Sequence, residues 1–245
     1  PHDKVAGKGV KKLMDAGCEV TVGVLEKECR EHHKRFLTFQ EKKRPFIILK
    51  WAETADGFIA PEKTLRSQNK EPYWITNTYS RQLVHKWRTE EQAILVGTNT
   101  VLDDNPKLDA RHWKGKNPTR IIIDRSLKIN ASYVVLDGTI STYIFTEITD
   151  SSKYINGVNY IQIDFTKSVA QQICHTLHQE NIQSVIIEGG SKTIQSFIDA
   201  NLWDEARVFI GKNSFKKGIK APKIKGRLKE EQNIQEDNLK IYYND

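Results

Sequence analysis

Cysteine is scarce in this sequence of 245 residues. The three cysteines, Cys18, Cys29 and Cys174, lie far apart in the chain. They are too few and too scattered for a disulfide framework or a closed zinc site, and the seven histidines show no metal-binding spacing. We therefore expect free thiols and no metal site.

Long apolar runs are missing too. No stretch approaches the roughly 20 apolar residues that a membrane-spanning helix needs. Residues 1–12 are polar and basic, so they lack the apolar core of a signal peptide. Together with free thiols, these absences predict a cytoplasmic protein without a membrane partner.

Several catalytic and nucleotide-binding motifs are absent as well. The sequence contains neither the GxGxxG fingerprint of dinucleotide-binding folds nor the phosphate-binding loop of NTPases. Its histidines lack the nucleophile-elbow context of a hydrolytic triad. A standard dinucleotide-binding fold, an NTPase and a triad hydrolase are therefore not supported.

The composition is that of an ordinary globular protein, with 38% hydrophobic and 28% charged residues, which suffices for one large domain or two small ones. The net charge of +7 favours acidic partners, either phosphorylated small molecules or nucleic acid. Residues 212–229 hold eight lysines and arginines and no acid. The glycines and proline of this segment predict a loop, which is either a solvated surface or a rim that faces phosphate. It lacks the interleaved aromatics that are typical of single-strand binders.

Two parts of the chain differ in pattern. Residues 1–44 predict a small unit, and the basic stretch that ends at Pro45 marks its boundary, because proline restricts the residue before it. From residue 46 onward, near-continuous runs of Ile and Val alternate with amphipathic helical patterns. This alternation predicts an α/β sandwich with a mostly parallel central sheet that is covered on both faces.

The predicted elements of the small unit are helices at 10–14 and 26–39 and a strand at 18–24. In the larger part we predict strands at 46–51, 93–97, 120–124, 142–146, 184–188, 206–211 and 238–243, the last at an antiparallel edge, and helices at 79–89, 169–180 and 192–200.

The strongest local signal is the string SVIIEGGSKT at 184–193. A strand ends in the carboxylate of Glu188, turns through two glycines and opens a helix. Ligands of α/β sheets bind at the carboxyl ends of strands, and a glycine turn before a helix lets backbone N–H groups approach a phosphate. The segment 189–196 is therefore a candidate phosphate cradle, with a tight structural turn as the alternative.

Other polar residues stand in unusual places. Lys50 lies within an otherwise apolar strand, so it must reach solvent, pair with an acid or face a ligand cavity. The string GTNTVLDDNP at 97–106 follows a buried strand and is either a binding loop or an ordinary polar loop. Arg88 and Arg111 are potential phosphate ligands, because guanidinium matches phosphate with two parallel hydrogen bonds.

Taken together, these segments resemble the reductase domain of the bifunctional riboflavin-biosynthesis deaminase/reductase. The matching strings cover most of residues 45–223 in the order and rough spacing of the family: LKWAETADG (49–57), WITN (74–77), AILVGTNTVLDDNP (93–106), RIIID (120–124), IEGG (187–190) and FIDANLWDE (197–205).

Residues 1–44 resemble the last part of the preceding deaminase domain, through the strings VAGKG (5–9), AGCEV (16–20) and GVLE (23–26). The zinc motif of that domain, a His-x-Glu and a pair of cysteines, is absent from this chain. The resemblance therefore implies a deaminase remnant at 1–44 and a reductase domain at 45–245, with zinc only in the missing deaminase part.

The resemblance also implies a dihydrofolate-reductase-like three-layer fold that uses NADPH to reduce the ribosyl group of 5-amino-6-(5-phosphoribosylamino)uracil to ribityl. Lys50 and Glu188 would be catalytic, and an ion pair between them is our hypothesis for how the sugar is positioned and its proton relayed. The family pairs through its reductase domains, which implies a homodimer with an edge at 209–215 or in the terminal strand.

The other site residues follow from matching positions. Substrate contacts match Arg88, Leu108, Arg111 and Glu188. Cofactor contacts match Glu53 (through its backbone), Trp74, Thr100 and Asp104, and the turn that holds the cofactor pyrophosphate matches Gly190, Ser191, Lys192, Thr193, Ile194, Gln195 and Ser196.

Two positions depart from the family pattern. Pro72 replaces a serine two residues before Trp74, which puts one substrate hydrogen bond in doubt. Arg125 replaces a serine after the third strand, where an arginine could meet the ribose phosphate that distinguishes NADPH from NADH.

Two other functions stay open at this point. One is a reductase that acts on the diaminopyrimidine before deamination, or another dihydrofolate-type reductase. The other is a non-catalytic basic module that binds nucleotides or RNA through residues 212–229, although we expect no nucleic-acid partner for the reductase.

Overall fold

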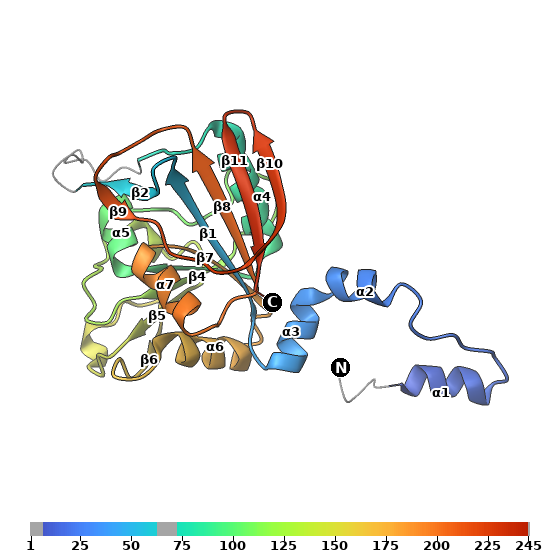
Figure 1. The fold of residues 1–245 in the computed structure, drawn as a ribbon. Coiled ribbons are helices and arrows are strands. Elements are labelled where there is room, and N and C mark those ends of the chain that lie inside the picture. Colours follow the sequence, from blue (N-terminus) through green and yellow to red (C-terminus); the bar gives the residue numbers. More distant parts are fainter. Residues whose placement is uncertain (1–6, 63–72, 245) are drawn as a thin grey trace.

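The computed structural model describes residues 7–62 and 73–244 (Figure 1). Nine of the described strands form one sheet in the order β10-β11-β8-β1-β7-β3-β4-β5-β6, and β2 (Phe58–Pro61) pairs with β9 (Gly218–Lys220) in a small second sheet. The strands of the large sheet are β1 (Phe46–Thr54), β3 (Ala93–Gly97), β4 (Thr119–Ile123), β5 (Thr142–Thr146), β6 (Asn159–Gln162), β7 (Ser184–Gly189), β8 (Glu205–Gly211), β10 (Arg227–Ile234) and β11 (Asp237–Tyr243).

The central part of the large sheet is parallel. Seven strands, from β8 to β6, run in the same direction, and β11 and β10 join β8 as an antiparallel hairpin. The central strands β1, β7 and β3 are buried along most of their length, which explains their near-continuous Ile and Val sequences. Their carboxyl ends therefore meet at one edge of the sheet.

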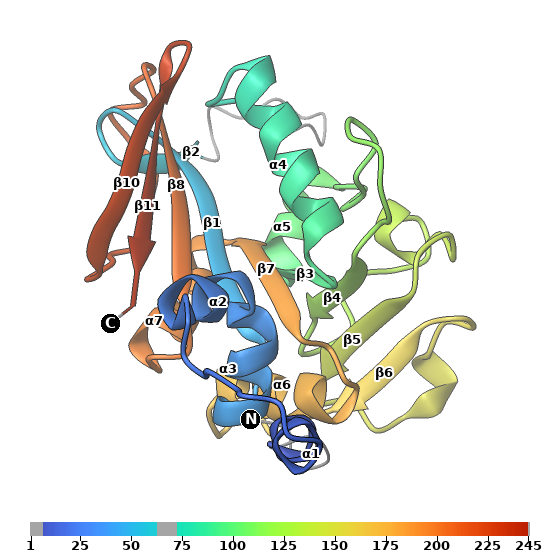
Figure 2. The same ribbon diagram turned by 90° about the vertical axis from the view of Figure 1, so that its right-hand side faces the viewer.

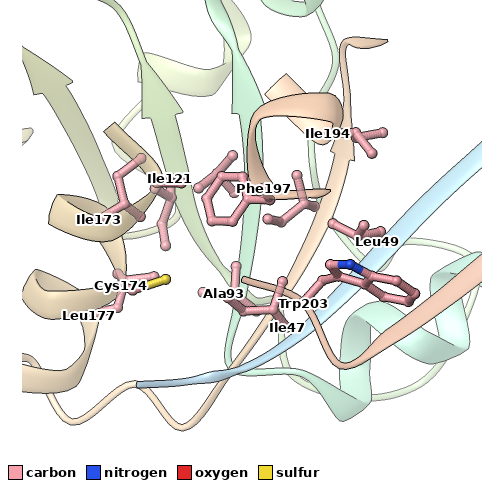
Figure 3. Close-up of a cluster of buried hydrophobic side chains, with 14 of the residues drawn as sticks. Ile47, Leu49, Ala93, Ile121, Ile173, Cys174, Leu177, Ile194, Phe197 and Trp203 are labelled. Carbon is pink, nitrogen blue, oxygen red and sulfur yellow. The ribbon is translucent and has the colours of Figure 1, made fainter. Parts of the chain in front are cut away.

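Helices cover both faces of the sheet (Figures 1 and 2). On one face, α6 (Val169–Gln179) and α7 (Ser191–Asp199) pack with Trp203 against the strands, and Figure 3 shows this cluster. On the other face, α4 (Thr78–Glu90) and α5 (Thr98–Asp104) pack together with the short 3₁₀ turn η2 (Val134–Leu136). The structure thus confirms the predicted three-layer α/β sandwich with a mostly parallel sheet.

The long helices begin where their sequences supply a cap. The side chain of Asn77 accepts a hydrogen bond from the Ser80 N–H at 3.0 Å at the start of α4. Ser168 caps α6 in the same way. The turn between β10 and β11 fixes α4 further, because the Asp237 carboxylate accepts hydrogen bonds from the Asn77 N–H and from Ser80 Oγ.

Most predicted elements are present within one or two residues, and two predictions are wrong. Residues 18–24 are exposed coil, because no neighbouring strand is available to accept their backbone hydrogen bonds in the described part of the chain. The predicted helix at 26–39 is two helices, α2 (Glu26–His32) and α3 (Lys34–Lys42). Helix α5 and the strands β2, β6, β9 and β10 were not predicted.

The edge of the sheet also differs from the expectation. β11 lies between β8 and β10, so the terminal strand is internal, and β10 forms the edge. Residues 209–211 belong to β8, which pairs on both sides, and they offer no free edge. Among the described residues, no helix is both long and apolar enough to span a bilayer.

Helix α3 packs against the sheet although it precedes the expected boundary at Pro45. Lys34 pairs with the buried carboxylate of Glu205 at 2.9 Å, and Arg35 pairs with Glu91. Arg44 binds Asp204 through two hydrogen bonds. By contrast, α1 (Lys8–Asp15) and α2 bury no residue, and α1 extends away from the sheet in Figure 1. Glu31 of α2 accepts a hydrogen bond from Tyr243 Oη of β11 at 2.7 Å, so contacts with the sheet begin near the end of α2. The division into a remnant at 1–44 and a domain at 45–245 stays a prediction.

A buried arginine ties two loops to the sheet. The Arg120 side chain in β4 is almost completely buried and donates hydrogen bonds to the carbonyls of Lys107 at 3.0 Å and Val135 at 3.2 Å, and to Asp137 at 2.8 Å. We expect Arg120→Met to lower the free energy of unfolding by about 3 kcal/mol, because these acceptors lose their donor.

Urea unfolding followed by circular dichroism measures this loss. Arg125→Met is the matched control, because Arg125 follows the same strand but is 60% exposed in a single ion pair with Glu147. It should cost less than about 1 kcal/mol. Equal losses in the two variants would show that Arg120 does not act as a buried clamp.

Candidate active site

Strands β1 and β7 bring Lys50 and Glu188 together. The parallel register pairs Leu49 with Ile187, so the next residue of each strand, Lys50 and Glu188, lies at the same level. Leu49 and Ile187 face the helices α6 and α7, and side chains alternate along a strand. Lys50 and Glu188 therefore point to the opposite face, toward α4.

Two cations hold the Glu188 carboxylate. Arg88 near the end of α4 donates from Nε and Nη2 to its two oxygens at 2.8 and 2.7 Å. The Lys50 Nζ lies 3.8 Å from Oε2, which is the ion pair expected from the sequence. The three side chains are only 8 to 16% exposed, so water screens their charges weakly.

This environment lowers the pKa of both Lys50 and Glu188. Burial by itself would raise the pKa of Glu188, but the charges of Arg88 and Lys50 outweigh it and lower the pKa to about 2. Burial lowers the pKa of Lys50, and Arg88 adds to this effect while Glu188 opposes it. Glu188 therefore stays ionised near neutral pH, whereas Lys50 releases its proton more easily than an ordinary lysine.

The loop after α5 joins this cluster. Arg88 Nη1 donates to the Asp109 carbonyl at 2.9 Å, and Arg111 Nη1 donates to the Asp109 carboxylate at 2.5 Å. The Arg111 side chain is 39% exposed, so part of its guanidinium can meet a ligand, whereas the Leu108 side chain is 3% exposed in the core. A substrate contact by Leu108 can therefore come only from its backbone.

Two histidines near the cluster were not singled out from the sequence. His85 lies one turn before Arg88 on α4, and its ring centroid is 4.7 Å from that of His112. Burial, followed by the charges of Arg88 and Arg111, lowers the pKa of His85 to about 4. Its buried Nδ1 has no hydrogen-bond partner among the described residues. Only the tertiary contact between α4 and the loop brings these rings together, so local sequence gave no signal for them.

Beside this cluster, the starts of α5 and α7 lie close together. A Cβ atom added to Gly97, which precedes α5, would lie 2.5 Å from Thr193 Oγ1. The Gly189–Gly190 turn before α7 lies beneath Thr100, whose Oγ1 is 3.3 Å from the Cβ position of Gly189. Gly189 has a φ of 153°, a region that favours glycine. Among the described residues, no side chain caps either helix start, so backbone N–H groups of both first turns are available to an anion.

The basic segment 212–229 borders the start of α7. Ser191 Oγ donates to the Lys220 carbonyl at 2.9 Å, and the Lys223 N–H donates to Gln195 Oε1 at 2.8 Å. The side chains of Ser191 and Gln195 are thus already bonded to the protein. This segment is mostly coil, as its glycines and proline predicted, but it also contains the short strand β9 and the first residues of β10, and its backbone borders the start of α7.

The remaining residues of the predicted pyrophosphate turn differ in exposure. Lys192 and Ser196 are exposed, and Ser196 Oγ donates to the Thr193 carbonyl. Ile194 is completely buried in the core (Figure 3), so only its backbone can meet a ligand. Gly190 precedes the first residue of α7.

The other predicted cofactor residues lie on neighbouring elements. Glu53 is the second-last residue of β1. Its carboxylate accepts a hydrogen bond from Trp51 Nε1 at 2.7 Å, and burial raises its pKa. Trp74 is 52% exposed, with the Arg81 guanidinium 4.7 Å from its ring. Asp104 ends α5.

Of the two departures from the family pattern, one can be located. Arg125 follows β4 and donates from Nε to Glu147 at 2.8 Å, and its guanidinium lies 5.5 Å from the ring centroid of Phe165. Its position at the carboxyl edge of the sheet agrees with a site for an anionic ligand group. Pro72 lies outside the described residues.

Residues 45–213 match the family model described as the RibD C-terminal domain. The riboflavin biosynthesis protein RibD of Aquifex aeolicus is 35% identical over 99% of this chain and 70% of its own length. The RibD protein of Bacillus amyloliquefaciens is 32% identical over 85% of this chain, and the match spans 57% of that protein.

A solved structure is similar over almost the whole chain. The diaminohydroxyphosphoribosylaminopyrimidine deaminase/5-amino-6-(5-phosphoribosylamino)uracil reductase of Thermotoga maritima has a TM-score of 0.86 and 32% identity, and covers 99% of this chain and 69% of that one. A RibD structure from Acinetobacter baumannii, at 24% identity and a TM-score of 0.85, shares the fold.

The ionised Glu188 predicts how the free energy of unfolding depends on pH. Its pKa is lowered from 4.5 to about 2, so the ionised carboxylate stabilises the fold above about pH 4.5. That contribution, on the order of 3 kcal/mol, is lost as the pH falls toward 2. We expect Glu188→Gln to be much less stable than the wild type at pH 7, and the difference to shrink steadily below pH 4.5 as the wild-type carboxylate takes up a proton.

Urea unfolding at a series of pH values measures this difference in free energy. Glu90→Gln is the control, because Glu90 is exposed and pairs with Lys86 at the end of α4, the helix that carries Arg88. It should differ from the wild type by less than about 0.5 kcal/mol at every pH. A difference between Glu188→Gln and wild type that does not change with pH would contradict an ionised, paired Glu188.

Proposed function

The chain belongs to the RibD C-terminal domain family, and from this premise we propose that it is an NADPH-dependent oxidoreductase of riboflavin biosynthesis. Its substrate is 5-amino-6-(5-phosphoribosylamino)uracil, and the ribosyl group of this compound is reduced to ribityl. The observation that carries the proposal is the buried Lys50–Glu188 pair beside two uncapped helix starts that nearly touch through glycines.

The described residues fit a dinucleotide cofactor at these helix starts. The close approach of Gly97 and Thr193 leaves backbone N–H groups from α5 and α7 on one anion site. The lysines of 212–229 add positive charge next to α7, which suits a pyrophosphate. Arg125 is well situated for the extra phosphate of NADPH. When bound, the nicotinamide supplies a hydride.

Lys50 and Glu188 take different parts in the reaction. The bond between C1 and the ring oxygen of the sugar must break to give an open-chain iminium ion, and the ring oxygen needs a proton as it leaves. Lys50 donates this proton, because its lowered pKa suits a general acid near neutral pH. Glu188 cannot be the acid with a pKa of about 2, so it orients Lys50 and accepts hydrogen bonds from sugar hydroxyls. One hydride at C1 of this iminium ion would complete the reduction, so one proton and one hydride balance the reaction.

Arg111 suits the phosphate of the substrate. It is the exposed guanidinium of the cluster and lies on the loop that borders Glu188 and Arg88. The whole protein in this family is longer than this chain, and its zinc-dependent deamination, a homodimeric assembly and a cytoplasmic location are further parts of this proposal. For the homodimer, the exposed strand β10 offers one of the two edges of the large sheet, and β6 forms the other.

Oxidation of NADPH followed by absorbance tests the function. The deaminated and non-deaminated ribosylaminopyrimidine phosphates are offered separately, with NADH as the control cofactor. We expect turnover of the deaminated compound with NADPH and much slower turnover with NADH. Turnover of only the non-deaminated compound would reassign the substrate, and steeply salt-dependent RNA binding without NADPH binding would replace the enzyme with a binding module.

Substitution of Lys50 tests the proton donor. Lys50→Met should lower kcat by about 10²–10⁴-fold, because the departing ring oxygen loses its acid. In the wild type, kcat/KM should fall as the pH rises through the lowered pKa of Lys50, and this alkaline limb should vanish in the variant. Lys86→Met removes an exposed lysine of α4 and should leave both properties unchanged. Unchanged turnover in Lys50→Met would disprove the assignment.

A further inference from the structure

The Trp74 indole is exposed to solvent but held on one side. The residue is 52% exposed, although tryptophan is on average one of the more buried residue types. The Arg81 guanidinium of α4 lies over one face of the ring, 4.7 Å from its centroid. The opposite face therefore accounts for much of the exposed area and is open to a flat ligand.

Two hydrogen bonds fix the arginine that covers the ring. Arg81 Nη1 donates to the Thr76 carbonyl, and Nη2 donates to Thr78 Oγ1 at 3.0 Å. The guanidinium is thus folded back over the start of α4 and over the chain that leads into it. A cation above an indole is attracted by the electrons of the ring, so Arg81 favours one orientation of Trp74.

The backbone next to Trp74 packs on the end of a strand. A Cβ atom on Gly211, the last residue of β8, would clash with the Ile75 carbonyl oxygen. Gly211 pairs with Thr54 at the end of β1, which is the residue after Glu53. Trp74 is therefore attached beside the strand ends that carry Glu53, another predicted cofactor contact.

The order of the strands indicates which end of a dinucleotide reaches this ring. Trp74 lies beside the ends of β8 and β1, the two uncapped helix starts follow β7 and β3, and Arg125 follows β4. A cofactor with its pyrophosphate at the helix starts and its extra phosphate at Arg125 has its nicotinamide on the side of β1. Lys50, the residue proposed to donate the proton, lies on that strand.

We propose that Arg81 is a positioning residue, which holds the Trp74 indole as a platform on which the nicotinamide ring of the cofactor stacks. The nicotinamide rests on the proposed function, whereas the hold of Arg81 on Trp74 does not. Stacking on a ring that is already fixed costs less entropy than stacking on a free one. Arg81 therefore strengthens cofactor binding through Trp74 and need not touch the cofactor.

Fluorine NMR tests the hold of Arg81 on the ring without any ligand. The five tryptophans are labelled as 5-fluorotryptophan, and the Trp74 signal is assigned from the spectrum of Trp74→Phe. We expect this signal in Arg81→Ala to sharpen and to move toward that of free 5-fluorotryptophan, because the ring loses the guanidinium. The control Lys86→Met, at an exposed position of the same helix, should leave it unchanged. An unchanged Trp74 signal in Arg81→Ala would overturn the proposal.

Calorimetric titration with two ligands tests the platform. Adenosine 2′,5′-bisphosphate contains the phosphorylated adenosine half of NADPH but no nicotinamide. Arg81→Ala should raise the Kd of NADPH about 3–10-fold and leave the Kd of adenosine 2′,5′-bisphosphate unchanged. Equal losses for both ligands, or a raised KM for the pyrimidine substrate with an unchanged Kd for NADPH, would overturn the proposal. Alanine favours a helix, and Arg81→Met, which keeps the apolar stem, takes its place if the alanine variant fails to fold.

A double-mutant cycle separates positioning from direct binding. If Arg81 acts through Trp74, Arg81→Ala should weaken NADPH binding in the wild type and cause no further loss in Trp74→Ala. Additive losses would show that Arg81 binds the cofactor by itself and would overturn the proposal. If the wild type binds no NADPH, the proposed function and the platform both fail, whereas the fluorine spectrum still decides whether Arg81 holds Trp74.

Discussion

The compensation of one buried carboxylate organises the site of this protein. Glu188 lies at the end of a strand that is covered on both faces, where an unpaired charge would be strongly unfavourable. Arg88 and Lys50 supply the counter-charges from a helix and from the neighbouring strand. The three side chains together leave a cation in excess, which suits a site for a phosphorylated substrate. The charges of Arg88 and Lys50 keep Glu188 ionised. Burial and the charge of Arg88 make Lys50 release its proton more easily than an ordinary lysine.

The topology of the sheet gives this cluster its surroundings. Strand β7 lies between β1 and β3, so the end that carries Glu188 has Lys50 on one side and Gly97 with the start of α5 on the other. The glycines of β7 continue into α7, which brings the two uncapped helix starts together. A site for an anionic cofactor and a site for proton transfer thus share one strand end. Arg120 also stabilises this region, because its side chain donates a hydrogen bond to the carbonyl of Lys107, near the start of the loop that carries Asp109 and Arg111.

Buried ion pairs also define how the chain enters the sheet. Helix α3 is rich in charge, and its sequence resembles an exposed surface helix. In the structure, Lys34 pairs with Glu205 and Arg35 pairs with Glu91. Lys42, at the end of α3, and Arg44, beside Pro45, both pair with Asp204. The helix therefore belongs physically with the sheet even though the family match begins at residue 45.

The sequence by itself determined the α/β class, most central strands and the candidates at their ends, because burial on both faces demands continuous Ile and Val and because glycines before a helix are a local signal. Local patterns also singled out Lys50, Glu188, Arg88 and Arg111, and the resemblance joined them into one site.

Only the tertiary structure decided which charges meet. The fork between Arg88 and Glu188 joins residues 100 positions apart, and the contact of His85 with His112 depends on how a loop packs on α4. The edge strand β10 escaped detection because its exposed polar residues carry no burial pattern. Such pairings depend on the order of strands in space, which no local pattern encodes.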